Sequence, residues 1–500
     1  ISTTLPRYIS TTVLLMISVG VLAGIVGTFT AWFVVRYSFT GSSWLQWALL
    51  MPLAIPGYVG AYALVDLLEY AGPVQSTLRG IFGWSSSQDY WFPEIRSFGA
   101  AVFVLSLALY PYVYLLTRVA FRDQASSVEE VARSLGASSY KRLFIINLPL
   151  ARPAIAAGVA IVMMETVNDF GTVDYFAVQT LTTGIFSVWL QSSNVGGAAQ
   201  LACVVLAMII LLVSLEKLSR RKMQFFNMSS KHNKVTKIKL KGFSNLLAFS
   251  CCFVPVLLGF ALPLIVLAEH SMSNPKLFLD RALIDATWNT VFTGTIAAAF
   301  TVVLSIFMVF GMKSIKGRLP KITMPITTIG YAVPGAVLGV GILIPLAALD
   351  NGLADAIYYI TQIDIGLIFT GTSFAIILAY IVRFFAIGQG ATEAALGRIS
   401  PNLEHAARSL GKSRTSVLNR IHLPIIKGSL GSAMLLVFVD CVKELPATLL
   451  LRPFNFNTLS TRVHEQASLE DLVNAAPAAI YISLVGLCAV VLLAKANKLD

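Results

Sequence analysis

Eleven stretches of roughly 20 mostly apolar residues follow one another along this chain. A helix of that length crosses the hydrocarbon core of a bilayer, where the backbone must satisfy its own hydrogen bonds. Because 56% of the residues are hydrophobic and only 12% are charged, ordinary soluble cores cannot bury the apolar surface. We therefore expect an all-α, polytopic membrane helical bundle. The predicted spans are 10–35, 45–69, 97–120, 151–171, 197–216, 245–268, 285–311, 322–349, 365–389, 427–450 and 475–495.

The basic residues that give the net charge of +12 lie mostly in short loops beside these spans. Such placement orients spans in a membrane, so we expect the lipid bilayer as surroundings and no nucleic-acid partner. The positive-inside rule places one set of loops in the cytoplasm and the other set outside. The cytoplasmic set is 36–44, 121–150, 217–242, 312–321 and 390–426. The outer set is 70–96, 172–196, 269–284, 350–364 and 451–474.

Two polar segments repeat with identical internal spacing. Residues 129–136 read EEVARSLG and are followed by INLP at 146–149, while 404–411 read EHAARSLG and are followed by IHLP at 421–424. Every position is displaced by 275 residues, and both copies lie in cytoplasmic loops. The sequence therefore predicts two parallel repeats, related by an axis along the membrane normal.

The two halves differ in their number of spans, five in the first and six in the second. Pro56-Gly57 pairs with Pro334-Gly335, which places the unmatched element before residue 10. We therefore expect a twelfth span in the full protein, ahead of Ile1. The predicted division is a first repeat at 1–218, a basic cytoplasmic linker at 219–242 and a second repeat at 243–500. The Pro-Gly steps fit both the lining of a transport path and ordinary membrane helices.

Each repeated segment is interpreted as a short amphipathic helix that ends at a glycine, followed by a Leu-Pro step that breaks the chain direction. Such a helix either docks into a cleft on another protein or anchors a loop at the membrane interface. Its occurrence twice at a fixed offset favours docking.

These residues resemble a known family. Glu130-Val131-Ala132, Gly136 and Ile146-Asn147-Leu148-Pro149 resemble the EAA loop of ABC-importer permeases. The stretches 164–176 and 443–454 are most similar to the iron(III) permeases of the type that depends on a periplasmic binding protein. The second copy departs from the pattern, because His405 stands where the first has Glu130.

The resemblance implies a permease of the bacterial inner membrane that engages two copies of an ABC ATPase subunit at its cytoplasmic face and a periplasmic substrate-binding protein. ATP and magnesium would bind on the ATPase subunits, and this chain would carry no cofactor. The implied ATPase-coupling residues are Glu129, Glu130, Ala132, Gly136, Glu404, Ala407 and Gly411.

Enzyme chemistry is not expected within the chain. The sequence Gly411-Lys412-Ser413 is the end of a phosphate-loop pattern, but Ala406 occupies the position of its first glycine and the context is a helix. The five histidines show no spacing typical of metal ligands. We expect separate subunits to hydrolyse ATP, and no stably bound metal.

Four acids in the spans are candidates for the transport pathway: Glu165, Asp169, Asp440 and Glu444. Within each pair the spacing is i and i+4, which predicts one shared helical face, and the pairs are displaced by 275 residues. Carboxylates in a membrane face a bundle interior or a water-filled path, where they could hold Fe(III) transiently. The alternative is a structural role, in which the acids bond to nearby backbone or to Lys443 and Arg452 and fix helix packing.

The predicted function is alternating-access import of ferric iron, driven by ATPase subunits that act on residues 129–149 and 404–424. Import of another small solute, such as a cationic vitamin, an oxyanion or a phosphonate, remains open. An ion-coupled secondary carrier is the alternative from a different class.

Overall fold

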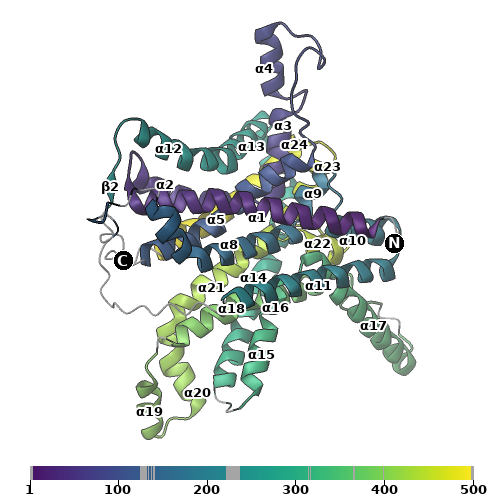
Figure 1. The fold of residues 1–500 in the computed structure, drawn as a ribbon. Helices are drawn as coiled ribbons and strands as arrows, with labels where there is room; N and C mark the ends of the chain where they lie inside the picture. Colours follow the sequence, from purple (N-terminus) through teal and green to yellow (C-terminus); the bar gives the residue numbers. More distant parts are fainter. Residues whose placement is uncertain are drawn as a thin grey trace. The chain divides into compact units, whose positions relative to one another are not determined.

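The computed structural model describes residues 4–123, 132, 134–136, 138, 141–220, 237–313, 315, 317–363, 366–397 and 399–496. These residues are almost entirely helical (Figure 1). A single short parallel strand pair is found among them, in which β1 (Tyr37–Ser38) lies beside β2 (Ile238–Lys239). The all-α fold class is confirmed.

Within those ranges, ten helices are long and apolar enough to cross a membrane. An eleventh span results if Ser42–Ala54 and Gly57–Phe82, which meet at a bend of 93°, count as one. The ten are Leu5–Arg36, Phe98–Arg122, Arg142–Asn168, Val195–Leu215, Phe243–Ser273, Arg281–Lys313, Gly335–Thr361, Ser373–Gly397, Arg414–Lys443 and Leu472–Leu492.

One predicted boundary is wrong. The sequence predicted the end of a span at residue 349 and an outer loop at 350–364, yet helix α17 (Gly335–Thr361) runs through most of this stretch. The Asp350 side chain is fully buried, and it accepts the backbone N–H groups of Ile368, Phe369 and Thr370 at 2.7–2.9 Å. Because these donors satisfy the carboxylate, the helix continues past it without exposing Asp350 to water.

The described part of the chain forms two compact units. The first gathers Ile1–Pro275 and Val463–Val490. In its core, α1 (Leu5–Arg36), α5 (Phe98–Asp123) and α8 (Leu148–Asn168) pack against one another (Figure 1). The other helical elements of this unit are α2 (Ser42–Ala48), η1 (Met51–Ala54), α3 (Gly57–Leu68), α4 (Pro73–Phe82), η2 (Arg142–Asn147), α9 (Gly171–Tyr175), α10 (Leu181–Phe186), η3 (Ser187–Gln191), α11 (Val195–Arg220), α12 (Phe243–Val256), η4 (Leu257–Ala261), α13 (Leu262–Ser273) and most of α24 (Leu472–Ala496).

The second unit gathers Lys276–Arg462 and the end of α24. Its core repeats the arrangement of the first, with α14 (Arg281–Lys313), α18 (Ser373–Gly397) and α21 (Leu423–Lys443) in mutual contact. The remaining elements are η5 (Pro275–Leu279, which starts at the boundary), α15 (Leu319–Thr327), α16 (Ile329–Ala332), α17, α19 (Pro401–Ser409), α20 (Arg414–Val417), η6 (Leu418–His422), α22 (Pro446–Leu451) and α23 (Leu459–Ser468, which continues into the first unit).

The two repeats share details of hydrogen bonding. The Leu181 backbone N–H donates to Thr12 Oγ1 at 2.9 Å, and the Leu459 N–H donates to Thr290 Oγ1 at 2.8 Å. Helix α12–α13 has no counterpart among the described residues of the first half, and it packs in the first unit. The packing units thus differ from the predicted repeat boundaries, which remain a prediction.

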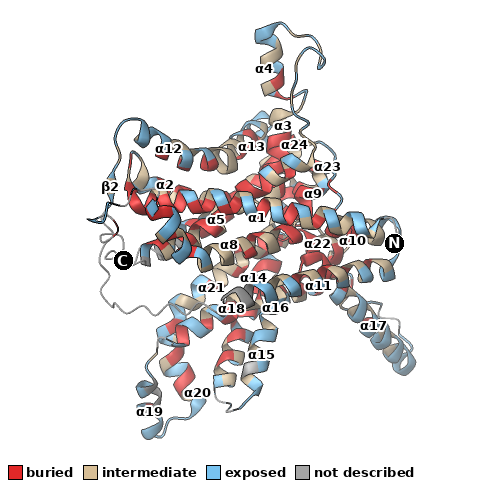
Figure 2. Ribbon diagram, in the orientation of Figure 1, coloured by how far each residue is buried: buried red, intermediate tan, exposed pale blue. Residues whose placement is uncertain are grey.

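Burial follows the expected membrane pattern (Figure 2). On α1, the large apolar side chains of Leu14, Ile17, Val21 and Ile25 recur every three or four residues and are exposed. The opposite face, including Leu15 and Val19, is buried against α5 and α8. A stripe of exposed apolar side chains on a core helix is the surface that lipid covers.

Candidate functional site

The first feature of the site is the end of each repeated segment. Gly411 follows α19 with a φ of +76°, and Gly136 in the first copy has a φ of +78°. The Gly411 N–H donates to the Arg408 carbonyl at 3.0 Å and the Lys412 N–H to the Ala407 carbonyl at 3.1 Å. This is a Schellman motif, which ends a helix at a glycine in the left-handed region. The predicted role of these glycines in turning the backbone is confirmed.

The structure describes only some of the other predicted coupling residues. Ala132 and Ala407 are buried at equivalent positions. Glu129 and Glu130 lie outside the described residues, as do the side chains of Glu404 and His405. The Gly411-Lys412-Ser413 stretch follows helix α19 rather than a strand, as the sequence indicated.

Each glycine is preceded by an exposed leucine that sequence reasoning missed. Leu135 is 80% exposed and Leu410 is 79% exposed, and open space surrounds both Gly136 and Gly411. A large apolar side chain projecting beside an open backbone is typical of a docking contact. The shared Ser-Leu-Gly tripeptide was the signal that could have identified these leucines.

The predicted break at each Leu-Pro step is wrong. A π-helical turn, η2 before Leu148 and η6 before Leu423, runs directly into the following α-helix. Pro149 and Pro424 each fall in the first turn of that α-helix, where a missing backbone N–H is tolerated. The π-turn and the α-helix that follows it form one span in each copy, Arg142–Asn168 and Arg414–Lys443.

The second feature is the far end of the same spans, where the candidate acids lie. Glu165 and Asp440 are half-buried in the last turns of α8 and α21. Asp169 and Glu444 are the first residues beyond these helices, with extended ψ values of 133° and 117°. Each second acid is the C-cap residue of its helix with a helical φ, −66° for Asp169 and −67° for Glu444, and the chain turns into α9 or α22 only after it. The shared helical face of each pair stays a prediction.

In the first repeat, Asp169 caps the short helix α9. Its Oδ1 atom accepts the N–H groups of Thr172 at 3.0 Å and Val173 at 3.2 Å, and its Oδ2 atom accepts the Thr172 hydroxyl at 2.9 Å. All of these donors are neutral. Hydrogen bonds of this kind stabilise the ionised form of a carboxyl group at a helix N-terminus.

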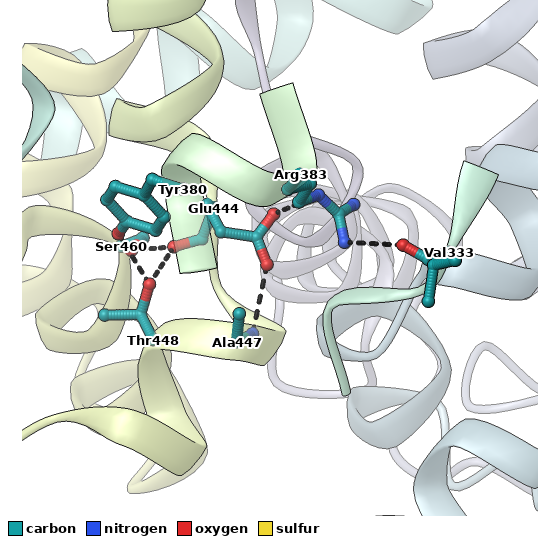
Figure 3. Close-up of polar contacts among 7 residues, drawn as sticks. All are labelled: Val333, Tyr380, Arg383, Glu444, Ala447, Thr448 and Ser460. Carbon is teal, nitrogen blue, oxygen red and sulfur yellow. Dashed lines mark hydrogen bonds and ion pairs between the residues drawn. The ribbon is translucent and has the colours of Figure 1, made fainter. Parts of the chain in front are cut away.

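In the second repeat, Glu444 is held by a charged partner (Figure 3). Its Oε2 atom lies 3.1 Å from Arg383 Nε, and its Oε1 atom accepts the Ala447 N–H at 3.0 Å. Both members of the ion pair are under 9% exposed. Arg383 also donates from Nη1 to the Val333 carbonyl at 3.3 Å. The backbone carbonyl of Glu444 accepts the hydroxyls of Thr448 and Ser460 at 2.9 and 2.8 Å.

The structural partner of Glu444 was not anticipated. The sequence suggested nearby backbone, Lys443 and Arg452 as partners. The bond from the Ala447 N–H is such a backbone bond, but the ion pair is with Arg383 on α18. Arg452 donates from Nη1 to Asn457 Oδ1. The charges of Lys443 and Arg383 both act on Asp440. At the 275-residue offset, the first repeat has Ala108 in place of Arg383 and Asn168 in place of Lys443. The two acid pairs therefore have different electrostatic surroundings.

The Pro-Gly steps begin the helices that pack against these acids. Pro56 and Pro334 precede α3 and α17 with nearly identical backbone angles, φ −58° and ψ 146° against φ −56° and ψ 143°. A methyl group on Gly57 would lie 3.1 Å from Thr172 Oγ1, and one on Gly335 would overlap the Glu444 carboxylate. Glycine is therefore required at position 335 by the close approach of the helix start to the acid-bearing turn, whereas a side chain at position 57 would need only a small shift of Thr172.

The comparison with known protein families shows which family this chain belongs to. The family described as binding-protein-dependent transport system inner membrane component matches residues 17–225 and again residues 308–498, which is more than half of the chain. The chain belongs to this family. The membrane-spanning helices agree with the description, so the protein is a multi-pass inner membrane component built from two copies of the family's domain.

Similar proteins cover the chain to different extents. The Fe(3+)-transport system permease protein FbpB 2 of Haemophilus influenzae is 27% identical over 493 residues, which is 97% of this chain and 89% of the relative. The ferric transport system permease protein FbpB of Actinobacillus pleuropneumoniae is 24% identical over 89% of this chain, which spans 64% of that relative. The molybdenum transport system permease protein ModB of Escherichia coli is 29% identical over 39% of this chain and 86% of its own length.

Proposed function

We propose that this protein is the membrane-spanning subunit of an ATP-driven importer that carries ferric iron from a periplasmic binding protein into the cytoplasm by alternating access. The observation that supports ferric iron as the substrate is the similarity to an Fe(3+)-transport permease along 97% of the chain, through both repeats. The molybdenum and sulfate permeases match only about two fifths of the chain.

The charges at the acid-bearing turns favour a cation rather than an oxyanion as the transported substrate. The Arg383 guanidinium is bound to Glu444 and to the Val333 carbonyl, so its positive charge is paired with a carboxylate of the protein. The donors bonded to the Asp169 carboxyl group are all neutral, so in its ionised form this acid supplies negative charge at the turn. In a low-dielectric environment such a charge attracts a cation far more strongly than in water.

The four acids therefore have two roles in this proposal. Asp169 contributes negative charge to the cation path, and Glu165 and Asp440 are further candidates for transient contact with the ion. Glu444 fixes the turn between α21 and α22 through its bond to Arg383. This division replaces the equal participation of all four acids that the sequence suggested.

The proposed coupling to ATP hydrolysis uses both repeated segments. Two ATPase subunits, with ATP and magnesium bound on them, would each dock against the exposed leucine and the open glycine at the end of one segment. The π-turn and the following membrane helix are continuous in each copy, so a push on the segment is transmitted to the acid-bearing turn at the other end. The binding protein would dock on the opposite face.

A secondary carrier is the competing class. An ATP-driven importer and a secondary carrier are distinguished by an uptake experiment. The purified chain is reconstituted in vesicles, and iron uptake is measured with and without its ATPase and binding protein. The proposal expects uptake only when all components and ATP are present. Uptake by the chain alone, driven by an ion gradient, would establish the carrier instead.

A further inference from the structure

A stripe of three lysines lies on one face of the chain around β2. Lys237, Lys239 and Lys241 are exposed, whereas Ile238 and Leu240 between them pack against the hydrophobic core of the first unit. This alternation is that of a half-buried strand, whose successive side chains point to opposite faces. The stripe is thus an ordered feature of the surface.

The position of the three lysines is fixed by the β1–β2 strand pair and by the segment that follows it. Tyr37 of β1 pairs with Ile238, and the Leu240 N–H donates to the Ser38 carbonyl at 3.0 Å. The Thr40 N–H then donates to Asn245 Oδ1 at 2.9 Å. These bonds fix the three lysines relative to the ends of two membrane helices.

Chain connectivity places the stripe at the depth of the lipid headgroups. β1 follows directly after the span Leu5–Arg36, and Phe243, two residues after Lys241, begins the span Phe243–Ser273. The strand pair is thus joined to one span through β1 and to another through the residues that follow Lys241. Lysine ammonium groups near the end of a span lie within reach of headgroup phosphates.

The surroundings of the stripe are basic and aromatic. The Arg118 guanidinium lies 4.8 Å from the ring centroid of Trp47, and Trp44 on the same short helix α2 is 47% exposed. Tryptophan is enriched at this level of a membrane. Partial desolvation and the charge of Arg118 both lower the pKa of Lys237.

We propose that Lys237, Lys239, Lys241 and Arg118 form a binding site for the phosphate group of an anionic phospholipid in the adjoining leaflet. An acidic protein surface has the same charge, but the short connections to two spans and the two tryptophans on α2, the helix that follows β1, favour a lipid. The bound headgroup would compensate clustered positive charge and tie the β1–β2 pair to the bilayer.

The test is native mass spectrometry of the purified full chain, with phosphatidylglycerol and phosphatidylcholine offered in equal amounts. The wild type is expected to retain phosphatidylglycerol preferentially, and Lys237→Gln/Lys239→Gln should lower that preference by about fivefold for each lysine removed. Lys237→Arg/Lys239→Arg should keep the preference. The matched control is Lys276→Gln/Arg281→Gln, which removes two exposed cations near the start of the span Arg281–Lys313.

Three results would overturn the proposal. The first is an unchanged lipid preference in the glutamine variant, or an equal loss in the control. The second is displacement of the retained phosphatidylglycerol by inorganic phosphate at the same concentration, which would indicate a site for a free ion. The third is weaker ATPase-subunit binding by the glutamine variant at unchanged lipid preference, which would assign the stripe to a protein partner.

Discussion

Arg383 Nε lies 3.1 Å from Glu444 Oε2 in a site from which water is almost excluded, and the equivalent position to Arg383 in the first repeat is Ala108. One acid-bearing turn is therefore held by a buried ion pair and the other by neutral hydrogen bonds. The two repeats therefore share the backbone arrangement around this turn but differ in the charged groups that hold its acid.

The ion pair predicts a large loss of stability when one member is removed. In Arg383→Ala, the Glu444 carboxylate loses its charged partner in a buried site, and we expect the free energy of unfolding to fall by roughly 3–5 kcal/mol. Arg383→Ala/Glu444→Gln should recover part of this loss, because no buried charge is left unpaired. The measurement is the melting temperature in detergent. A melting temperature of Arg383→Ala equal to that of the wild type would refute the structural role of the pair.

Asp169 is predicted to affect transport more than stability. In Asp169→Asn, the amide oxygen can still accept the backbone N–H groups of α9, while the negative charge is lost. We expect iron uptake to fall at nearly constant melting temperature. Thr172→Val is the matched control, because it removes a hydroxyl bonded to the same carboxylate but leaves the charge. Normal uptake by Asp169→Asn would remove this acid from the pathway.

The difference between Asp169 and Glu444 also shows what the sequence could reveal. The spans, the two repeats and the glycines at 136 and 411 were predictable, because apolar length and repeated spacing are local properties of the chain. The partner of Glu444 was not, since Arg383 lies 61 positions earlier on another helix and only packing brings them together. The Leu-Pro steps were misinterpreted because a π-turn, which has no clear sequence signal, runs into the α-helix at each of them.

The conformation of Gly411 gives a prediction about coupling. Gly411→Val places a β-branched residue at a φ of +76°, which should disrupt the end of α19 and abolish ATP hydrolysis stimulated by the binding protein. Gly83→Val imposes the same strain at a φ of +69° at the end of α4 and should leave the stimulation intact. ATPase rates of the two assembled complexes are the measurement. Equal loss in both variants would point to a general defect in folding.

The exposed leucines predict a contact with the ATPase subunits. Leu410→Ala removes an apolar side chain that is 79% exposed, so the permease itself should be unaffected while its binding to the ATPase weakens. We expect a drop in affinity of about tenfold or more, typical of the loss of an interfacial anchor. Leu403→Ala, at a leucine that is 48% exposed on the same helix, is the control. Unchanged affinity in both Leu410→Ala and the equivalent Leu135→Ala would exclude these contacts.

The most direct test of the proposed function is transport by the purified complex. The permease, its ATPase and its binding protein are reconstituted in vesicles, and uptake of ferric iron is measured in competition with molybdate. We predict uptake of iron that requires ATP and the binding protein and is not reduced by molybdate. Accumulation of molybdate in place of iron, or iron uptake that continues without ATP, would contradict the account.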